Sequence, residues 1–534
     1  MDQTRRPQSV RAAWTAACLG LTLAAGSACA QTPPSTTPGT PVTARIPQGA
    51  LVGVDEGDVR SFKGIPYAAP PVGDLRWRAP RPAVAWTGVR DASAFGADCI
   101  QPRPGWDDTQ SKQPTSEDCL TLNVWAPETR TAEPLPVIVW IHGGGFIMGS
   151  GSQPLFDGAR LASRGVVVVT FNYRLGRFGF FAHPALTAEA GDAPTANYGL
   201  MDQVAALRWV HDNINALGGD PERVTIMGQS AGGGSVLQLM TMAEARGLFR
   251  GAVVQSGGGR DHLPPLTAPA GQRSGESVGE AFAASVNLRN ATAADLRALP
   301  AERVRGRLDL LNPERNTFTG PIIDGRLVTT QTLDAFTRGE QAPVPLIIGA
   351  TDFELGSIPS FLRGMVADRT LEDVEVSKPD LMTIYGTSDT LNRAMPSELT
   401  FVEPARRLAA LDAAAGHPVW LYSFGYVAES KRREWSGAPH ASDLGYGFDT
   451  LGRLKGDYSE ADQRIATAMA DYWAAFARDG RPDAAGQPEW PRYNPDSDRA
   501  LLVGETGVSI GPSPEAARLD ALGRLRDAAR AVSP

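Results

Sequence analysis

Ten residues near the middle of the chain restrict its fold more than any other stretch. Residues 224–233 read Val-Thr-Ile-Met-Gly-Gln-Ser-Ala-Gly-Gly, so an apolar run typical of a β-strand ends in Gly-x-Ser-x-Gly and continues into small residues. The pattern predicts a sharp strand-to-helix turn that holds Ser230 at its apex, with the hydroxyl clear of the backbone. Glycine is expected at Gly228 and Gly232 because a side chain at either position would collide with the turn.

Apolar, strand-like runs alternate with helix-like segments on both sides of this turn. The alternation predicts an α/β fold with a mostly parallel central sheet and helices on both faces. We expect an edge hairpin over residues 51–62 and a helix over residues 204–217. The remaining predicted strands, apolar as strands covered on both faces are, are residues 122–125, 137–141, 166–171, 224–227, 252–255, 346–348 and 419–424, the last strong one.

Two stretches interrupt the alternation. Residues 259–318 are polar and helix-like, and residues 357–415 contain several short helices. Both follow strands that carry candidate catalytic residues, so they are candidates for a lid or a gorge wall, with ordinary helical decoration as the alternative. Residues 513–532 are predicted to form an amphipathic helix that docks against the core. Together, residues 45–534 are expected to form a single domain.

The first 44 residues are expected to lie outside this domain. Residues 1–30 contain three early arginines, an apolar stretch at 12–25 and an Ala-x-Ala cleavage pattern, which is typical of a signal peptide. The apolar stretch is too short to span a bilayer, so we predict no stable membrane insertion after cleavage and a periplasmic or secreted protein. Lipidation at Cys29 is the alternative, although Gly26 stands where such sites usually have Leu. Residues 31–44, rich in Pro and Thr, are predicted to be a disordered tether.

Charge and cysteine content exclude some classes of protein. The formal net charge is -8 and no basic run occurs, which argues against nucleic-acid binding. Two of the four cysteines fall in the predicted signal peptide, which leaves Cys99 and Cys119 in an exported chain. A disulfide between them is expected, with two buried thiols as the alternative. No spacing indicates a metal site, we expect no cofactor, and the oligomeric state is not legible.

Gly-x-Ser-x-Gly also occurs at residues 275–279 and 507–511 in this chain of 57 glycines. Ser509 is excluded because all histidines precede it, whereas this architecture orders the nucleophile, the acid and the histidine in that sequence. Ser277 is excluded because the residues before it are polar and turn-forming, and provide no strand. Ser230 therefore remains the candidate nucleophile.

A glycine-rich loop directly follows the strand predicted at residues 137–141. Residues 142–146 read His-Gly-Gly-Gly-Phe, and consecutive glycines let the backbone approach a carbonyl group closely. Stabilising a tetrahedral oxyanion needs two or three convergent N–H groups, and this type of loop accompanies the serine turn. We predict that Gly144, Gly145 and Ala231 are these donors; a flexible glycine turn is the alternative.

The candidate base must follow the serine, which leaves His262, His417 and His440. His262 lies in a polar loop before any plausible acid, and His417 opens a strand, where a structural role is favoured. His440 lies in a loop beyond the last predicted strand, where α/β folds place reacting groups. It is therefore the candidate base.

The acid that orients the histidine is expected between Ser230 and His440, just past a strand. The strand at residues 346–348 is followed by Asp352 and Glu354. Both qualify, with Asp324 as a distant third. The chemistry of the residues alone does not separate Asp352 from Glu354.

Further motifs give the chain a specific resemblance. It is similar to the type-B carboxylesterases, the family that also includes cholinesterases, bile-salt lipases and neuroligins, and the resemblance covers nearly all of residues 45–510. It implies an α/β-hydrolase fold. The motifs that carry it, besides the serine turn and the glycine loop, are residues 116–124, 172–176, 197–203, 218–221 and 255–257.

The resemblance implies roles for several residues. In the family the acid falls five residues after the glycine at the strand end and is usually Glu, which selects Glu354 over Asp352. A second serine near the triad corresponds to Ser256, which is expected to hydrogen-bond the acid rather than react. The first disulfide of the family corresponds to Cys99 and Cys119.

Two departures from the family pattern leave the reacting groups in place: Gln229 stands where Glu is common, and Leu355 where Gly usually follows the acid.

The expected activity is hydrolysis of a small-molecule carboxylic ester through a Ser-Glu-His triad and an acyl-enzyme intermediate. A lipase or large-ester hydrolase with residues 357–415 as a lid is the alternative. A non-catalytic, neuroligin-like binding module is remote, because all three triad positions are filled. The sequence does not name the ester.

Overall fold

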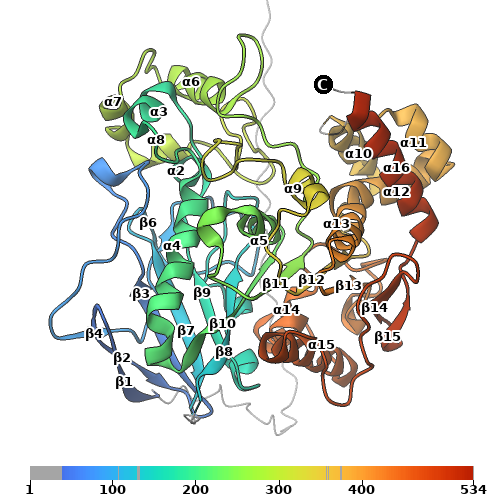
Figure 1. Ribbon diagram of the computed structural model, residues 1–534, viewed down its shortest axis with the longest axis horizontal. Coiled ribbons are helices and arrows are strands. Elements are labelled where there is room, and N and C mark those ends of the chain that lie inside the picture. The colour runs from blue at the N-terminus through green and yellow to red at the C-terminus, as the bar shows by residue number, and fades with distance from the viewer. Residues whose placement is uncertain are drawn as a thin grey trace, which may run out of the picture. The chain divides into compact units, whose positions relative to one another are not determined.

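The computed structural model describes residues 39–105, 107–128, 133–356, 358, 360–372, 374 and 376–532 (Figure 1). The predicted signal peptide, residues 1–30, lies outside the described residues, as does the predicted tether up to residue 38.

The predicted end of the tether at residue 44 is wrong, because a strand of the domain already begins at Thr40. Strand β1 (Thr40–Ile46) pairs antiparallel with β2 (Gly49–Asp55) along its whole length. Val42 and Ala44 pack against the core from alternate positions of β1, and Pro41 is compatible with β1 because this is an edge strand. Apolar alternation therefore outweighs the Pro/Thr composition, and the domain begins before residue 45.

The described strands form a 13-stranded sheet and a separate two-stranded pair, β5–β6. The order in the large sheet is β1-β2-β3-β7-β9-β8-β10-β11-β12-β13-β14-β15, with β4 beside β2. Neighbours from β9 to β14 are parallel, and the two margins of the sheet are mainly antiparallel. The remaining bounds are β3 (Val59–Pro66), β4 (Val89–Asp91), β5 (Asp98–Cys99), β6 (Thr115–Ser116), β7 (Thr121–Pro127), β8 (Leu135–Ile141), β9 (Val167–Phe171), β10 (Gly219–Gln229), β11 (Gly251–Gln255), β12 (Leu346–Thr351), β13 (Val419–Phe424), β14 (Arg499–Gly504) and β15 (Gly507–Pro512).

The predicted strands all occur, and the predicted hairpin at residues 51–62 is the β2–β3 pair. The prediction stopped too early, because β14 and β15 follow the strand that was expected to be the last strong one. β14 adds in parallel to β13, and β15 closes that edge as an antiparallel hairpin partner. Both strands are short and flanked by polar residues, so their apolar signal is weak.

Apolar residues of the sheet face two separate cores. In β8, Val137, Val139 and Ile141 belong to one cluster, and Ile138 and Trp140 belong to the other. This alternation confirms that helices cover both faces of the sheet. The first core includes residues of α2 (Gly176–Gly179), α3 (Pro184–Ala190), α4 (Tyr198–Asn213), α5 (Ala231–Thr241), α9 (Thr332–Arg338) and α13 (Glu403–Ala414), and the second includes residues of α1 (Ala159–Ala162), α14 (Leu444–Gly447) and α15 (Glu460–Asp479).

Both predicted insertions are helical. Figure 1 shows α6 (Gly275–Ser285), α7 (Ala293–Arg297) and α8 (Ala301–Arg305) gathered at one end of the sheet. The second insertion contains α10 (Arg363–Leu371), α11 (Lys378–Tyr385), α12 (Ser388–Ser397) and the π-helical turn η6 (Glu398–Val402), which leads into α13. Among the described residues, no helix is both long and apolar enough to cross a bilayer.

The C-terminal helix α16 (Ala516–Val532) forms within the predicted range and buries its apolar face, as predicted. Its Leu522 is fully buried in a small cluster with Leu381 of α11 and Leu391 and Met395 of α12. Figure 1 shows α16 lying beside these helices. An amphipathic pattern identifies the buried face of a helix but not its partner, so the sequence did not indicate that these partners come from the second insertion.

The chain forms the predicted disulfide between Cys99 and Cys119, which are 20 residues apart. Replacing both with Ser is expected to lower the free energy of unfolding by about 3 kcal/mol, because the unfolded chain regains loop entropy. Urea unfolding followed by circular dichroism would measure the change, with the oxidised wild type as reference. The variant should also be insensitive to dithiothreitol. Equal stability of the variant and the oxidised wild type would contradict the prediction.

Candidate active site

Ser230 is the single residue between a strand and a helix. β10 ends at Gln229, α5 begins at Ala231, and Ser230 has φ 57° and ψ -126°. A positive φ is costly for a residue with a side chain, so the surroundings must hold it. The N–H of Ser230 donates to the carbonyl of Gln255 in β11 (2.9 Å), and the N–H of Gly234 donates to the carbonyl of Ser230 (2.8 Å).

The two flanking glycines are required by backbone contacts. A Cβ on Gly228 would lie 2.4 Å from the carbonyl oxygen of Gly232, and a Cβ on Gly232 would lie 2.0 Å from the carbonyl oxygen of Ile141. Neither position tolerates a side chain without moving the backbone. Gly232 thereby lets the first turn of α5 press against the end of β8.

The other two Gly-x-Ser-x-Gly matches have ordinary surroundings. Ser277 lies in the first turn of α6, where it forms a capping box with Ser274. Ser509 lies on the edge strand β15 and is exposed. Only the match at residues 228–232 forms a strand–turn–helix.

Glu354 and His440 meet beyond the carboxyl ends of β12 and β13. Nδ1 of His440 is hydrogen-bonded to Oε2 of Glu354, and the backbone N–H of His440 donates to the carbonyl of Glu354 (2.8 Å). Glu354 is buried, and its Oε1 accepts hydrogen bonds from Oγ of Ser256 (2.5 Å) and the N–H of Thr351 (2.9 Å). Each carboxylate oxygen therefore has a fixed partner, and Ser256 contacts the acid as expected.

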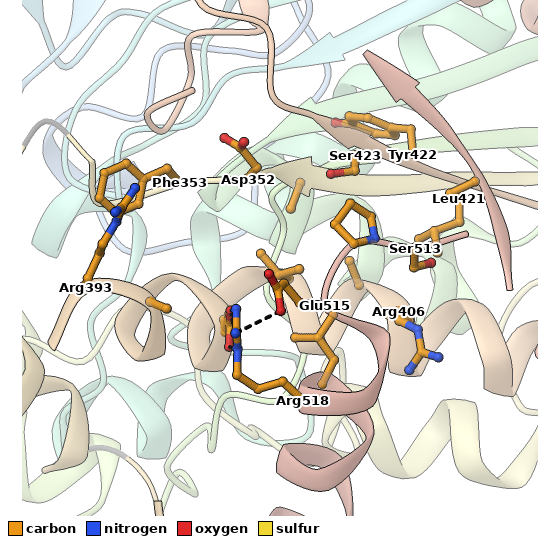
Figure 2. A pocket seen from close by; sticks show the side chains of 18 of the residues that line it. Asp352, Phe353, Arg393, Arg406, Leu421, Tyr422, Ser423, Ser513, Glu515 and Arg518 are labelled. Atoms are coloured by element: carbon orange, nitrogen blue, oxygen red, sulfur yellow. Dashed lines mark hydrogen bonds and ion pairs between the residues drawn. The ribbon is translucent and has the colours of Figure 1, made fainter. Parts of the chain in front are cut away.

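The other candidate residues have other partners. Asp352 bonds the backbone of the histidine loop rather than the imidazole and faces a different cavity (Figure 2). Asp324 accepts three backbone hydrogen bonds within its own turn. His417 pairs with Asp412 (2.7 Å), and His262 is exposed. The tertiary structure thus separates Asp352 from Glu354, which residue chemistry alone did not.

The electrostatic surroundings of His440 raise its pKa. Burial acts to lower the pKa of this histidine, but the charge of Glu354, the hydrogen bond to it and the charge of Asp443 outweigh burial and raise the pKa above its usual value. Burial, together with the charge of Glu354, raises the pKa of Asp443 to about 6. An imidazole with a raised pKa accepts a proton more readily.

Two contacts of His440 were not anticipated as such from the sequence. Its Nε2 lies 3.1 Å from Nε2 of Gln229, and within the described chain no hydrogen bond joins His440 to the hydroxyl of Ser230. The ring of Phe401, in η6, stacks on the imidazole at a centroid distance of 4.8 Å. Gln229 stood out only as a departure from the family pattern, and Phe401 has no local signal, because it comes from the second insertion.

The glycine loop after β8 lies against the serine turn. Gly144 and Gly145 have φ 102° and 62°, and a Cβ on Gly143 would lie 2.6 Å from the carbonyl oxygen of Gln229. In the described part of the chain, the N–H groups of Gly144, Gly145 and Ala231 donate no backbone hydrogen bond, as expected for a loop and a helix N-terminus. No backbone carbonyl therefore occupies these three N–H groups.

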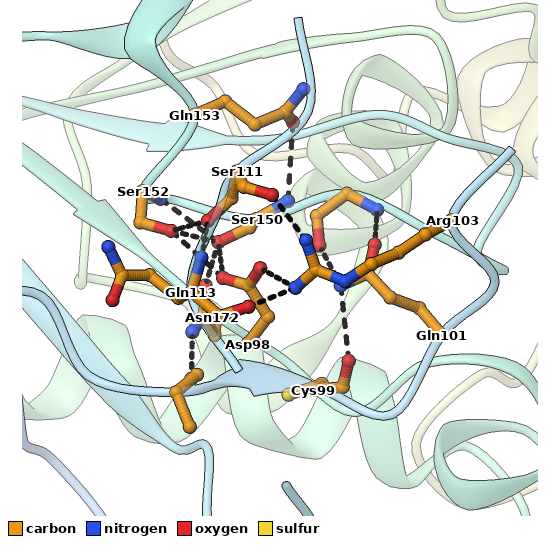
Figure 3. Close-up of polar contacts among 12 residues, drawn as sticks. Asp98, Cys99, Gln101, Arg103, Ser111, Gln113, Ser150, Ser152, Gln153 and Asn172 are labelled. Atoms are coloured by element: carbon orange, nitrogen blue, oxygen red, sulfur yellow. Dashed lines mark hydrogen bonds and ion pairs between the residues drawn. The ribbon is translucent and has the colours of Figure 1, made fainter. Parts of the chain in front are cut away.

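A buried carboxylate anchors the segment that follows the glycine loop (Figure 3). Asp98 accepts hydrogen bonds from the hydroxyls of Ser150 (2.5 Å) and Ser152 (2.8 Å). The side-chain amide of Gln101 both donates to and accepts from the backbone of Gly149, at 2.8 Å in each case. The disulfide-closed segment thus fixes the chain on the far side of the loop.

A cavity of about 680 Å³ opens over these groups and is lined by Ser230, His440, Gly144 and Gly145. Its wall is mostly apolar and aromatic, with Lys431, Lys455 and two aspartates among the charged residues. No cluster of His, Cys, Asp or Glu suited to hold a metal ion occurs among the described residues. The apolar and aromatic wall residues include Leu155, Phe156, Leu310, Tyr426, Trp435 and Tyr458.

Comparison with known proteins decides the family. The model of the carboxylesterase family matches residues 40–521. The chain belongs to the carboxylesterase family. It is 36% identical over 500 residues to fumonisin B1 esterase of Sphingopyxis macrogoltabida, with 88% of each chain covered. It is 35% identical over 486 residues to para-nitrobenzyl esterase of Bacillus subtilis (strain 168), covering 88% of this chain and 95% of that one.

Solved structures of carboxylesterases have the same fold. A PNB esterase structure superposes with a TM-score of 0.78 at 32% identity, covering 90% of this chain and 99% of the other. A carboxylesterase of Geobacillus stearothermophilus at pH 6.2 gives a TM-score of 0.76 at 33% identity with the same coverage. This carboxylesterase therefore has an α/β-hydrolase fold and is a carboxylic ester hydrolase.

Substitutions at Gln229 test whether this residue affects the pKa of His440. Gln229→Glu would place a negative charge near Nε2 of His440, which stabilises the imidazolium and raises its pKa further. The acid limb of the kcat/KM profile should therefore move to higher pH, with lower activity at neutral pH. Gln229→Met is the control: it removes a donor to the unprotonated Nε2 without adding charge, so it should move the limb upward by less than Gln229→Glu does. An unchanged limb in Gln229→Glu would contradict the contact.

Proposed function

We propose that this carboxylesterase cleaves its ester with Ser230 as the nucleophile, His440 as the general base and Glu354 as the orienting acid. The observation that carries the proposal is the hydrogen-bonded pair of Glu354 and His440 at the cavity that also exposes the strained Ser230. Glu354 can hold the imidazole only one way, since Ser256 and Thr351 already occupy its other oxygen.

Acylation starts with transfer of the Ser230 proton to Nε2 of His440, for which the amide of Gln229 must give up its contact. Oγ then bonds to the ester carbonyl carbon, and the π electrons of the carbonyl move to its oxygen. We propose that the N–H groups of Gly144, Gly145 and Ala231 stabilise this oxyanion. The C–O bond to the alcohol breaks as the imidazolium returns the proton to the leaving oxygen.

Deacylation repeats the same steps with water. His440 takes a proton from the water molecule, whose oxygen attacks the acyl carbon of the Ser230 ester. The same oxyanion donors act again, and collapse of the tetrahedral intermediate breaks the bond to Oγ, which recovers its proton from the imidazolium. Glu354 stabilises the imidazolium in both halves of the reaction.

The cavity supports an ester with a bulky apolar part as the substrate. Its volume of about 680 Å³ is within the range of pockets that enclose drug-sized ligands. Aromatic side chains such as Trp435 and Tyr458 favour an aryl or a branched aliphatic group over a short polar one. Relatives named for para-nitrobenzyl esters and for fumonisin B1 support the same class.

A lipase with a lid is the second candidate, because large apolar side chains are exposed at the cavity and in the second insertion. Leu310 lines the cavity, and its neighbour Leu311 is 74% exposed. Phe361 (83% exposed) and Met365 (62% exposed) occur at the start of the second insertion, and Arg369 of α10 borders a separate pocket with residues 312–317. Exposed apolar side chains of this kind suit contact with an aggregated ester.

We also propose that the chain is exported. The support comes from the signal-like N-terminus and from the Cys99–Cys119 disulfide, since stable disulfides are typical of oxidising compartments. Cell fractionation with amino-terminal sequencing of the mature protein would test it, and a cytosolic full-length chain would contradict it.

Ser230→Ala should reduce hydrolysis of p-nitrophenyl butyrate by about a million-fold, as removal of a serine nucleophile does in a triad, while circular dichroism stays unchanged. Ser277→Ala, at a match of the same pattern, is the control and should retain wild-type activity. A fluorophosphonate label should map to Ser230 by mass spectrometry. Substantial activity in Ser230→Ala, or a label on Ser277, would refute the assignment.

Dispersed tributyrin separates the two candidate functions. For an esterase, we expect the rate to saturate as the dissolved ester does, with no jump above the solubility limit. The paired change Leu311→Ser and Phe361→Ser should leave hydrolysis of p-nitrophenyl butyrate unaltered. A rate that jumps above the solubility limit, and loses that jump in the double variant, would instead establish the lipase.

A further inference from the structure

The turn after β12 carries two carboxylates, and only one of them touches the histidine side chain. Asp352 and Glu354 both point toward the loop at residues 437–440, but they bind different parts of it. Glu354 binds the imidazole, whereas Oδ1 of Asp352 accepts a hydrogen bond from the backbone N–H of Ala438 (2.8 Å). Ala438 lies two residues before His440, just as Asp352 lies two residues before Glu354.

The two segments are joined along their whole facing length. The N–H of Phe353 donates to the carbonyl of Ala438 (3.2 Å), and the N–H of His440 donates to the carbonyl of Glu354 (2.8 Å). The N–H of Asp352 donates to the carbonyl of Phe424 at the end of β13 (2.9 Å). The carboxylate of Asp352 is therefore one member of a short ladder that holds the histidine loop to the acid turn.

Glycines on both sides make room for this carboxylate. A Cβ on Gly425 would lie 2.7 Å from Oδ2 of Asp352, and a Cβ on Gly437 would lie 3.2 Å from its Oδ1 and 2.7 Å from Cβ of Phe353. The two glycines therefore leave room for the carboxylate of Asp352 beside the end of β13 and the start of the histidine loop, and the residue is exposed on its other side, toward the neighbouring cavity.

Two arginines near Asp352 have carboxylate partners of their own. Arg518 pairs with Glu398 (2.6 Å) and Glu515 (2.9 Å), and Arg406 pairs with Asp498 (3.0 Å). Both arginines line a cavity of about 470 Å³ with Asp352, Phe353 and Arg393 (Figure 2), and Arg393 lies over the ring of Phe353. Among the described residues Asp352 has no ion pair, so its directed contact is the one to Ala438.

From these contacts we infer that Asp352 is a positioning residue for the reaction, whose carboxylate oxygen fixes the loop at residues 437–440 and so keeps the imidazole of His440 over Ser230. The inference rests on the proposed function of His440 as the base. It assigns a task to the carboxylate that competed with Glu354 in the sequence. If the loop were mobile, the imidazole of His440 would be displaced from its position for proton transfer. Small displacements of a catalytic group lower the reaction rate by large factors.

Four variants test whether kcat depends on the position of the acceptor oxygen of Asp352 or on its negative charge. Asp352→Ala removes the acceptor and is expected to lower kcat for p-nitrophenyl butyrate at pH 8 about tenfold, the effect of one lost hydrogen bond in the transition state, with KM nearly unchanged. Asp352→Asn keeps an acceptor oxygen and should retain most of the activity. Asp352→Glu keeps the charge but displaces the oxygen, for which the cavity has room, and should lose activity like Asp352→Ala. Asp389→Ala, which removes a carboxylate from the same cavity, is the control and should match the wild type.

The pH profile adds a readout that a merely structural role would not change. Desolvation of the carboxyl group on the side that faces the histidine loop raises the pKa of Asp352 to about 6, against the hydrogen bond from Ala438 and with help from the charge of Glu354. Protonation below that pH weakens the acceptor, so Asp352→Asn should make the acid limb of kcat less steep. The charged groups that face Asp352 are Glu354 on its own turn, Asp389 and Arg393 on α12, Glu398 on η6, Arg406 on α13, and Glu515 and Arg518 at the start of α16.

The effect of Asp352 on the stability of the fold should decrease as pH rises, whereas its effect on kcat should increase. A carboxyl group whose pKa rises on folding favours the folded state at low pH, and this contribution is lost as pH rises through about 6. Asp352→Asn should therefore not lower Tm at pH 8. The inference is overturned if Asp352→Ala and Asp352→Glu keep the wild-type kcat, if Asp352→Asn falls as far as they do, or if Asp389→Ala falls equally. Activity in Ser230→Ala would refute the proposed function itself.

Discussion

The contact between the first turn of α5 and the end of β8 is the constraint on which the site depends. A Cβ on Gly232 would lie only 2.0 Å from the carbonyl oxygen of Ile141, so helix and strand meet backbone to backbone. That approach forces Ser230 into its positive φ and brings the glycine loop that follows Ile141 against the same turn. This one backbone contact thus places both the proposed nucleophile and the N–H groups of the glycine loop.

The histidine is held from several directions by parts of the chain that are far apart in sequence. Glu354 binds Nδ1, the amide of Gln229 contacts Nε2, and Phe401 stacks on the ring. Asp352 adds a hold on the loop itself. Three of these contacts come from segments after β12, so the second insertion and its neighbouring turns position the proposed base. In the proposed mechanism, this arrangement keeps the imidazolium close to the carboxylate of Glu354.

Much of the fold follows from apolar patterning, and its failures have identifiable causes. Strands that are buried on both faces have continuous apolar runs, and all of the predicted ones occur. β1 was hidden by a Pro/Thr-rich composition although Val42 and Ala44 alternate toward the core. β14 and β15, the last two strands at one end of the sheet, have a weak apolar signal, and the partner of α16 is set by the insertion rather than by the helix. The edges of the sheet were therefore less predictable than its centre.

The sequence by itself determined the turn that carries Ser230, because an apolar strand run precedes Gly-x-Ser-x-Gly only there and its two glycines exclude any side chain. Chain order left three histidines, and the place of His440 in a loop after a strand made it the candidate base. Residue chemistry did not separate Asp352 from Glu354, and the family resemblance favoured Glu354. The tertiary structure brings Glu354 to the imidazole although the two residues lie 86 positions apart, because β12 and β13 are adjacent and in register. The contact of Gln229 with His440, over 211 residues, and the stacking of Phe401 depend on the same long-range packing. Local patterns encode backbone conformation over a few residues, whereas the meeting of distant side chains depends on strand order and register.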